Sequence, residues 1–287
     1  LHVKKSGLKN VYFVHLHTKN LTIKIYMKVP ATEKRPLILV TNDDGIEAKG
    51  VHELVKMIED LGDIVVVAPD SPRSGQSSAL SVGIPLRLNL IEHYRNISFY
   101  RTNGTPVDCV KLSMNQLFDR QPDLLLSGIN HGSNSGVSIV YSGTMGAALE
   151  GCIIGIPSIG FSLTSHEPDT DFSPCREIVR ESCKKVLEKG LPPSVCLNIN
   201  IPAIPRPKGA RICRQAQGYW TEEYDHRIDP HGKDYYWLTG RFMNLEPENE
   251  ETDEWALAHG YISIVPCTCD QTAYSAIPEI NDLLSLE

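Results

Sequence analysis

The sequence lacks the features of a membrane protein and of a disulfide-stabilised secreted domain. No apolar run reaches the roughly 18–20 residues that a membrane-spanning helix needs, and the longest candidate, 151–161, is interrupted by Gly155 and Pro157. The eight cysteines include no Cys-x-x-Cys pair, and Cys267 and Cys269 have no second pair nearby in the sequence to complete a zinc site. We therefore expect reduced structural thiols in a cytoplasmic protein without membrane association.

Several motifs of nucleotide-binding proteins and hydrolases are also missing. No Gly-x-Gly-x-x-Gly follows the first predicted strand and there is no Walker loop, which argues against dinucleotide or NTP binding of those kinds. The Gly-x-Ser-x-Gly nucleophile elbow is absent. The formal net charge is −7 and no basic stripe is present. This charge pattern predicts no stable nucleic-acid partner.

The composition is that of an ordinary globular protein, except at the N-terminus. Apolar residues make up 41% of the 287 residues, which is enough for one large α/β domain. Residues 1–32 contain six lysines and no acidic residue, so they carry +6 and the remainder carries −13 (−7 minus +6). We interpret residues 1–34 as a poorly ordered N-terminal extension and Met27 as the working start; a basic N-terminal arm is the alternative.

Short apolar runs alternate with amphipathic segments between residues 35 and 202. Residues 37–41 and 64–68 are predicted to be buried strands, and residues 48–61 between them a helix with one apolar face. Further strands are expected at 124–126, 158–163 and 195–199, and further helices at 105–117, 144–154 and 173–189. This alternation predicts a Rossmann-like, doubly wound, mostly parallel α/β sheet.

The character of the sequence changes after residue 202. Residues 205–245 are rich in aromatic side chains and predict an extended β-hairpin or arm. An acidic loop at 246–254, a short helix at 254–259 and a strand at 261–265 follow. Residues 35–266 are thus expected to form one domain with a core at 35–202, and residues 267–287 a C-terminal tail or short helix.

Polar clusters follow the predicted strands, where ligands bind in doubly wound sheets. Residues 42–45 read Asn-Asp-Asp-Gly after the first strand. Two adjacent aspartates repel each other unless a cation lies between them, and hard oxygen ligands suit Mg²⁺, Mn²⁺ or Ca²⁺. Ser74 and Asn130 could supply neutral oxygens. The same composition also occurs in turns and helix N-caps, so both interpretations stay open.

A second cluster resembles an anion-binding helix start. Ser142, Gly143 and Thr144 would present hydroxyl and backbone N–H groups at a helix N-terminus, where phosphate is favoured, although Ser and Thr are also routine capping residues. The glycine-rich loop with Asn134 could line the other side. His131 in that loop is a candidate general acid or a solvent-exposed loop histidine.

Taken together, the motifs resemble the survival protein E (SurE) family of nucleotidases. The motifs occur in order and span about residues 36–266; they are 38–45 (Ile-Leu-Val-Thr-Asn-Asp-Asp-Gly), 67–70 (Val-Ala-Pro-Asp) with 73–75 (Arg-Ser-Gly), 104–109 (Gly-Thr-Pro-Val-Asp-Cys), 127–130 (Ser-Gly-Ile-Asn), 141–144 (Tyr-Ser-Gly-Thr) and 198–202 (Asn-Ile-Asn-Ile-Pro). Residues 130–134 depart from the pattern, because family members often carry proline before the last asparagine.

The resemblance implies a metal-dependent 5′-(3′-)nucleotidase, active on nucleoside monophosphates and in some members on short polyphosphate. It implies one divalent ion per subunit, Mg²⁺ or Mn²⁺, bound by Asp43, Asp44, Ser74 and Asn130, with both aspartates catalytic. It implies substrate or phosphate contacts from Asn42, Gly75, Asn134, Ser142, Gly143 and Thr144. It also implies that the aromatic arm is exchanged between subunits, giving a homodimer or homotetramer.

The residues alone leave three kinds of protein open: an enzyme, a binding module and a structural oligomer. Within an enzyme, water could attack the phosphorus directly, or an aspartyl-phosphate could form. The chain could instead be a nucleotide-binding oligomeric module without turnover, or a structural oligomer built around the arm.

Overall fold

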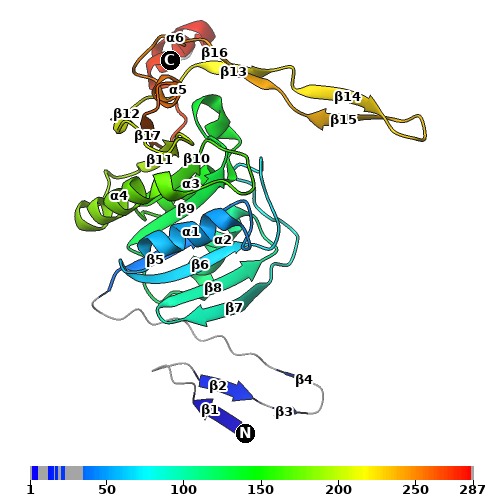
Figure 1. The fold of residues 1–287 in the computed structure, drawn as a ribbon, viewed down its shortest axis with the longest axis vertical. Coiled ribbons are helices and arrows are strands. Elements are labelled where there is room, and N and C mark those ends of the chain that lie inside the picture. Colours follow the sequence, from blue (N-terminus) through cyan, green and yellow to red (C-terminus); the bar gives the residue numbers. More distant parts are fainter. Residues whose placement is uncertain (1, 6–11, 16, 19–20, 23–34, 286–287) are drawn as a thin grey trace.

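A single nine-stranded sheet forms the centre of the molecule (Figure 1). The computed structural model describes residues 2–5, 12–15, 17–18, 21–22 and 35–285. The strand order is β12-β17-β11-β10-β9-β5-β6-β8-β7. In chain order the strands are β5 (Leu37–Thr41), β6 (Asp63–Pro69), β7 (Leu88–Tyr94), β8 (Ile97–Thr102), β9 (Leu124–His131), β10 (Ser158–Leu163), β11 (Cys196–Ile201), β12 (Ala210–Ile212) and β17 (Ile262–Cys267).

The sheet is mostly parallel, as predicted. Antiparallel pairing occurs between β7 and β8 and between β11 and β17, and the other neighbours in this sheet run parallel. From β5 the chain first builds outward through β6 and β8, then returns to the other side of β5 to build β9, β10 and β11. The direction of winding therefore reverses between β5 and β9, and ligand sites of doubly wound sheets lie at such a reversal.

Helices cover both faces of the sheet because its strands are apolar on both sides. Leu37 and Leu39 of β5 belong to one buried cluster, and Ile38 and Val40 belong to the other. Helices α1 (Lys49–Ile58) and α4 (Arg176–Lys189) contribute to the second cluster, whereas α2 (Pro106–Gln116) and α3 (Gly143–Ile153) contribute to the first. The predicted α/β class and the predicted core helices are confirmed.

Three parts of the sheet were not predicted correctly. Strand β12 was predicted to belong to the arm at 205–245, but it pairs with β17 and forms one edge of the central sheet. The hairpin of β7 and β8 was missed, because β7 is mostly exposed and has no apolar run. Residues 127–131 were predicted to be a loop, but they continue strand β9. The reason is pairing along the neighbouring strand, since Asn130 and His131 lie in register with Ser162 and Leu163 of β10.

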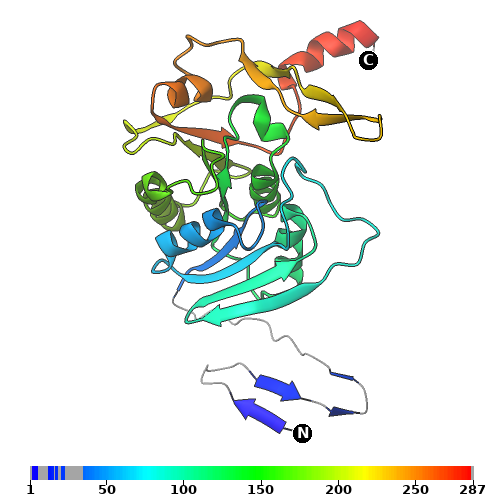
Figure 2. The ribbon, with the colours of Figure 1, turned by 45° about the vertical axis from the view of Figure 1, so that its right-hand side comes forward.

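The aromatic segment forms the predicted arm. Strand β13 (Gly218–Thr221) pairs with β16 (Arg241–Asn244), and β14 (Tyr224–Ile228) pairs with β15 (Asp234–Leu238). Figures 1 and 2 show this hairpin extending away from the sheet. The remaining helical segments are η1 (Gly136–Val140), η2 (Ser173–Cys175), α5 (Asp253–Ala258), η3 (Tyr274–Ala276) and α6 (Ile277–Leu284).

Near the N-terminus the structure describes two short antiparallel strand pairs, β1 (His2–Lys5) with β2 (Tyr12–His15) and β3 (His17–Thr18) with β4 (Leu21–Thr22). Residues 23–34, which include Met27, lie outside the described residues, so the interpretation of 1–34 stays a prediction. Within the described part of the chain, none of the helices has the length and apolar character needed to cross a membrane.

Candidate active site

The Asn-Asp-Asp-Gly run lies at the carboxyl end of β5, at the reversal point of the sheet. Thr41, the last residue of β5, pairs with Ser127 of β9, so residues 42–45 emerge beside the last residues of β9. The Asn42 amide donates to the carbonyl of Gly45 at 2.8 Å and thereby closes the turn. Gly45 has a φ of +99°, which favours glycine, and a β-carbon there would lie 3.3 Å from the backbone of Ser71. The turn therefore packs tightly against the segment after β6.

Asp43 is buried and is held from two directions. Its side chain is only 4% exposed. Oδ1 accepts a hydrogen bond from the Thr144 hydroxyl at 2.5 Å, and its backbone carbonyl accepts one from the Arg73 N–H at 2.7 Å. Burial raises the pKa of Asp43 to about 6, with a smaller upward contribution from the charge of Asp44; the Thr144 hydrogen bond opposes the rise. The carboxylate is thus costly to ionise in the protein alone.

Asp44 is less buried and faces the end of β9. Its Oδ2 accepts a hydrogen bond from the backbone N–H of His131 at 3.2 Å. Burial raises the pKa of Asp44, and the His131 N–H together with the nearby His131 and His166 side chains opposes that rise. Adjacent carboxylates therefore point to different partners, one on α3 and one on β9.

The first turn of α3 lies directly against Asp43. Ser142 caps the helix, since its hydroxyl oxygen accepts a hydrogen bond from the Met145 N–H at 3.0 Å. A β-carbon at Gly143 would lie 2.8 Å from Cβ of Asp43, so glycine allows the helix to approach this closely. The hydroxyl and the backbone of Thr144 both contribute hydrogen bonds that lower the pKa of Asp43. The structure thus brings Asp43 together with Gly143 and Thr144, and Ser142 caps the helix that carries them.

Hydrogen bonds fasten the loop after β6 both to Asp43 and to the segment that leads into α3. The Arg73 N–H binds Asp43, the Ser77 N–H donates to the Tyr141 carbonyl at 3.0 Å, and the Ser77 hydroxyl donates to the Val140 carbonyl at 2.7 Å. Ser74 and Gly75 lie exposed between these anchors, and Gly75 adopts a φ of +72° in open space. Ser74 is thereby carried to the neighbourhood of Asp43, while its role as a metal ligand stays a prediction.

The two predicted asparagines differ in their surroundings. Asn130 donates through Nδ2 to the carbonyls of Gly132 at 2.9 Å and His131 at 3.2 Å, which turns its Oδ1 away from that loop. Asn134 is held on three sides. Its N–H donates to Asn200 Oδ1 at 2.8 Å, its Nδ2 to Ser162 at 2.8 Å, and its carbonyl accepts from Asn198 at 2.8 Å. Asn130 suits a ligand role better than Asn134, whose hydrogen bonds fix the loop.

His166 is a further candidate residue of the active site, although the sequence patterns did not single it out. It follows β10, and a β-carbon at Gly132 would lie 2.2 Å from its Cε1, so its ring covers that glycine. It is also close enough to Asp44 to lower the pKa of that carboxyl. The sequence did contain a signal for this residue, because it follows the carboxyl end of a strand. His131 packs edge-on against Phe172 at 5.1 Å, which places one face of its ring away from solvent.

The donor set at this site fits a hard divalent cation. Two carboxylates and neighbouring amide and hydroxyl oxygens are the ligand types that Mg²⁺ and Mn²⁺ prefer. Asn42 Oδ1 is buried without a hydrogen-bond partner among the described residues, and burial raises the pKa of Asp43 to about 6. A cation would supply the positive charge that favours the ionised form of this carboxyl group. Among the described residues, no group of three or more His, Cys, Asp or Glu is arranged to hold a metal ion.

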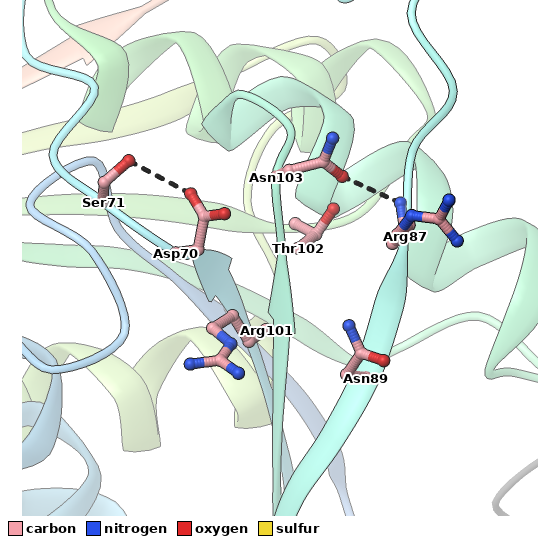
Figure 3. A pocket seen from close by; sticks show the side chains of 7 residues that line it. All are labelled: Asp70, Ser71, Arg87, Asn89, Arg101, Thr102 and Asn103. Carbon is pink, nitrogen blue, oxygen red and sulfur yellow. Dashed lines mark hydrogen bonds between the residues drawn. The ribbon is translucent and has the colours of Figure 1, made fainter.

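A cavity of about 490 Å³ opens at the same edge of the sheet, beyond the carboxyl ends of β6 and β8. Figure 3 shows its polar lining, which consists of Asp70, Ser71, Arg87, Asn89, Arg101, Thr102 and Asn103. The Asp43–Asp44 pair does not line it. Arg73 connects the two places, since its guanidinium donates to Asp70 and to the Asn103 carbonyl, both at 3.2 Å, while its backbone N–H binds Asp43.

Comparison with known proteins identifies the family of the chain. The sequence model of the family described as Survival protein SurE matches residues 38–222. The chain is 52% identical to 5′-nucleotidase SurE of Bacteroides thetaiotaomicron over 250 residues, covering 86% of this chain and 96% of the relative. It is 49% identical to 5′-nucleotidase SurE of Flavobacterium psychrophilum, covering 86% and 97%.

A solved structure gives the same result for the fold. The crystal structure of the SurE protein from Aquifex aeolicus superposes with a TM-score of 0.75 at 38% sequence identity, covering 87% of this chain and all of that chain. The family match extends over more than half of this chain, and the two relatives align along nearly their whole length. This chain therefore belongs to the SurE family.

Proposed function

We propose that this protein hydrolyses nucleoside 5′-monophosphates to nucleoside and inorganic phosphate, with one divalent ion, Mg²⁺ or Mn²⁺, at the Asp43–Asp44 pair. The observation that carries the proposal is the contact between Asp43 and the first turn of α3. This contact supports the proposal because a carboxylate that would bind the cation lies beside a helix N-terminus, where phosphate is favoured. The SurE relatives named as 5′-nucleotidases support the same activity.

Asp43, Asp44, Ser74 and Asn130 would hold the metal. Once bound, the ion would act as a Lewis acid toward the phosphate and lower the pKa of a coordinated water. Ser142, Gly143 and Thr144 would bind phosphate oxygens through hydroxyl and backbone N–H groups, and Asn42, Gly75 and Asn134 would shape the surrounding loops. The Thr144 hydroxyl fixes Oδ1 of Asp43, so the second oxygen of Asp43 or the Asp44 carboxylate would orient the attacking water and accept its proton.

We further propose that the arm joins subunits into a homodimer or homotetramer. The support is the exposure of its apolar side chains, since Trp237 is 60% and Leu238 is 70% exposed in the single chain. We also propose a cytoplasmic location, which is consistent with eight free cysteines. Nucleoside 3′-monophosphates and short polyphosphate are proposed as additional substrates of the same site, because each presents a terminal phosphate to the same helix start.

One assay tests the activity. Phosphate release is measured from nucleoside 5′- and 3′-monophosphates and from short polyphosphate, each with Mg²⁺, with Mn²⁺ and after chelation. Metal-dependent turnover of the 5′-monophosphates is the expected result. Nucleotide binding without phosphate release would instead identify a binding module, and turnover that is unchanged by chelation would contradict the metal site.

Rapid acid quenching separates the two chemical routes. Direct attack by water predicts no phosphate bound to the protein in the quenched sample. A trapped, acid-stable phosphoenzyme would show that an aspartate attacks the phosphorus instead.

A further inference from the structure

Two arginines line the cavity beyond β6 and β8 without a partner of opposite charge. Neither the Arg87 nor the Arg101 guanidinium forms a hydrogen bond or an ion pair with any residue in the described part of the chain. In Figure 3 the dashed line at Arg87 ends at its backbone nitrogen, and none ends at Arg101. Most other described arginines are paired with a carboxylate, as Arg180 is with Asp60. These two guanidinium groups are therefore available to an anion that enters the cavity.

The hairpin of β7 and β8 brings these groups together. Asn89 and Arg101 are directly opposite each other in the antiparallel pair, and both line the cavity. The backbone N–H of Arg87 donates to Asn103 Oδ1 at 2.8 Å, and Asn103 Nδ2 donates to the Pro85 carbonyl at 3.3 Å. These bonds hold the chain that enters β7 against the end of β8. The side-chain amide of Asn89 has no hydrogen bond with another described residue, so it offers a neutral donor beside the two arginines.

The lining is positively charged, although the chain as a whole is acidic. Its charged side chains are Arg87, Arg101 and Asp70, with a net charge of +1, whereas the chain carries −7. Asp70 is already engaged, because its Oδ1 accepts hydrogen bonds from the Ser71 hydroxyl at 3.1 Å and from the Arg73 guanidinium at 3.2 Å. Guanidinium groups bind phosphate through paired N–H donors. The lining therefore suits a small compound that carries phosphate.

The cavity lies next to the turn that carries Asp43. Ser71 lines the cavity, and its backbone packs against Gly45, where a β-carbon would lie 3.3 Å away. Arg73 spans the two places. Its backbone N–H donates to the Asp43 carbonyl at 2.7 Å, and its guanidinium donates to Asp70 at 3.2 Å. Because a single residue joins the cavity lining to the turn, one small substrate can reach both.

We propose that this cavity binds a second phosphate group of the substrate, in addition to the one that is hydrolysed. Arg87 and Arg101 bind it through charge-assisted hydrogen bonds, and Asn89 adds a neutral donor. The assignment rests on the proposed function, in which the first phosphate lies at the start of α3. The substrates favoured in this way carry more than one phosphate, either as a short inorganic polyphosphate or as a nucleoside 3′,5′-bisphosphate. The two arginines thus determine specificity and take no part in bond breaking.

Steady-state kinetics of the full-length protein test the proposal. Phosphate release from adenosine 5′-monophosphate, tripolyphosphate and adenosine 3′,5′-bisphosphate is measured at a fixed concentration of free Mg²⁺ or Mn²⁺. Wild type is compared with a double variant that carries Arg87→Gln and Arg101→Gln, and because both side chains are exposed the variant should fold normally. The ratio of kcat/KM for a substrate with several phosphates to kcat/KM for the monophosphate should fall by about 10- to 100-fold, the effect of one lost charge-assisted hydrogen bond. The loss should appear in KM.

Arg176→Gln is the matched control. Arg176 is an exposed arginine of α4 that does not line the cavity, so its substitution should leave the ratio unchanged. In the double variant, a lower ratio for tripolyphosphate alone would identify polyphosphate as the ligand, and a lower ratio for the bisphosphate alone would identify the nucleoside compound. An equal loss of kcat/KM for all three substrates, or no loss for any of them, would overturn the second phosphate site.

A binding measurement separates this site from the proposed activity. Tripolyphosphate and adenosine 3′,5′-bisphosphate are each titrated calorimetrically into the metal-free wild type and the metal-free double variant. At least one of them should bind the variant about 10-fold more weakly or worse, whether or not the protein hydrolyses phosphate esters. Equal affinities of wild type and variant for both compounds would overturn the second phosphate site even in an active enzyme. Weaker binding by the variant, without turnover of any substrate by wild type, would overturn the proposed function alone.

Discussion

At the carboxyl edge of the sheet two carboxylates lie inside the protein, whereas along the arm a row of aromatic rings lies in water. Asp43 is 4% exposed and Trp237 is 60% exposed. Each value is the opposite of what the side chain prefers on its own, since burial of a charge and exposure of large apolar surface both cost free energy. We interpret the edge as the proposed site of a cation and a phosphate substrate, and the arm as the proposed contact with a second subunit.

The regions also differ in how they are held. The edge is fixed by hydrogen bonds from three separate segments, through Arg73, His131 and Thr144. The arm is joined to the body mainly at its base, where the Arg214 guanidinium binds Glu246 and the ring of Phe242 covers Gly136 and Gly218. A rigid frame suits a site that must position reacting atoms, and a long hairpin suits a surface that reaches another subunit. Substitutions at the edge should therefore change catalysis, and substitutions in the arm should change subunit association.

The largest effect is expected at the edge, from Asp43→Asn. Loss of the carboxylate that we propose as a metal ligand should lower kcat/KM for a nucleoside 5′-monophosphate by about 10³-fold. Because burial raises the pKa of Asp43 to about 6, the metal-free variant should be more stable than the wild type at pH 7.5 by about 1–3 kcal/mol, measured by urea unfolding. Glu188→Gln, an exposed change on α4, should alter neither quantity. Lower stability of the Asp43→Asn variant would show that the pair is structural.

The second effect belongs to the arm. Trp237→Asp places a charge in the proposed subunit contact and should weaken association by about 30-fold or more, as for an aromatic contact at the centre of an interface. Light scattering across a dilution series measures the change. Val82→Asp is the matched control, because Val82 is also exposed, at 86%, and lies on another loop. Equal masses for wild type and both variants would remove the arm from the interface.

Thr144→Val should give a smaller loss at the edge. The substitution removes the hydroxyl that donates to Asp43 at 2.5 Å and keeps the shape of the side chain. One charge-assisted hydrogen bond is worth about 1.5–3 kcal/mol, so kcat/KM should fall by about 10- to 100-fold. Thr144→Ser restores the hydroxyl and should recover most of the activity. If serine and valine variants lose activity equally, the methyl group rather than the hydrogen bond positions Asp43.

The smallest effect is expected at the base of the arm and depends on pH. The hydrogen bond from Arg214 lowers the pKa of Glu246 to about 2, with a further contribution from the Gln217 N–H. A depressed pKa means that the stabilisation is fully present above the ordinary value of 4.5 and is lost as the pH falls toward 2. Glu246→Gln should therefore be slightly less stable than wild type at pH 6.5, and the difference should shrink at pH 3.5. A pH-independent difference in urea midpoints would contradict the ion pair.

Much of the fold could be predicted because its strands and helices carry strong local patterns. Buried strand β5 is an uninterrupted apolar run, and α2 begins at a Thr105–Asp108 capping box. The hairpin of β7 and β8 was missed because β7 is exposed along most of its length. The end of β9 was missed because pairing with β10, rather than local composition, keeps 127–131 extended.

The candidate site was predictable in outline and not in its contacts. The predicted strands placed residues 42–45, 74 and 130 at one edge of the sheet, and the order of the motifs suggested what each residue does. That Thr144 would bind Asp43, or that His166 would cover Gly132, depends on how α3 and the segment after β10 pack. Such distances arise from tertiary structure and leave no periodic signal.

Cation binding at the Asp43–Asp44 pair is tested most directly by calorimetric titration of Mn²⁺ into the wild-type protein and into Asp43→Asn, with phosphate release from a nucleoside 5′-monophosphate measured on the same samples. Wild type should bind one ion per subunit and turn over only when that site is filled, and the variant should lose both properties together. Unchanged Mn²⁺ affinity in the variant, or turnover by wild type at a metal concentration where the site is empty, would contradict the assignment.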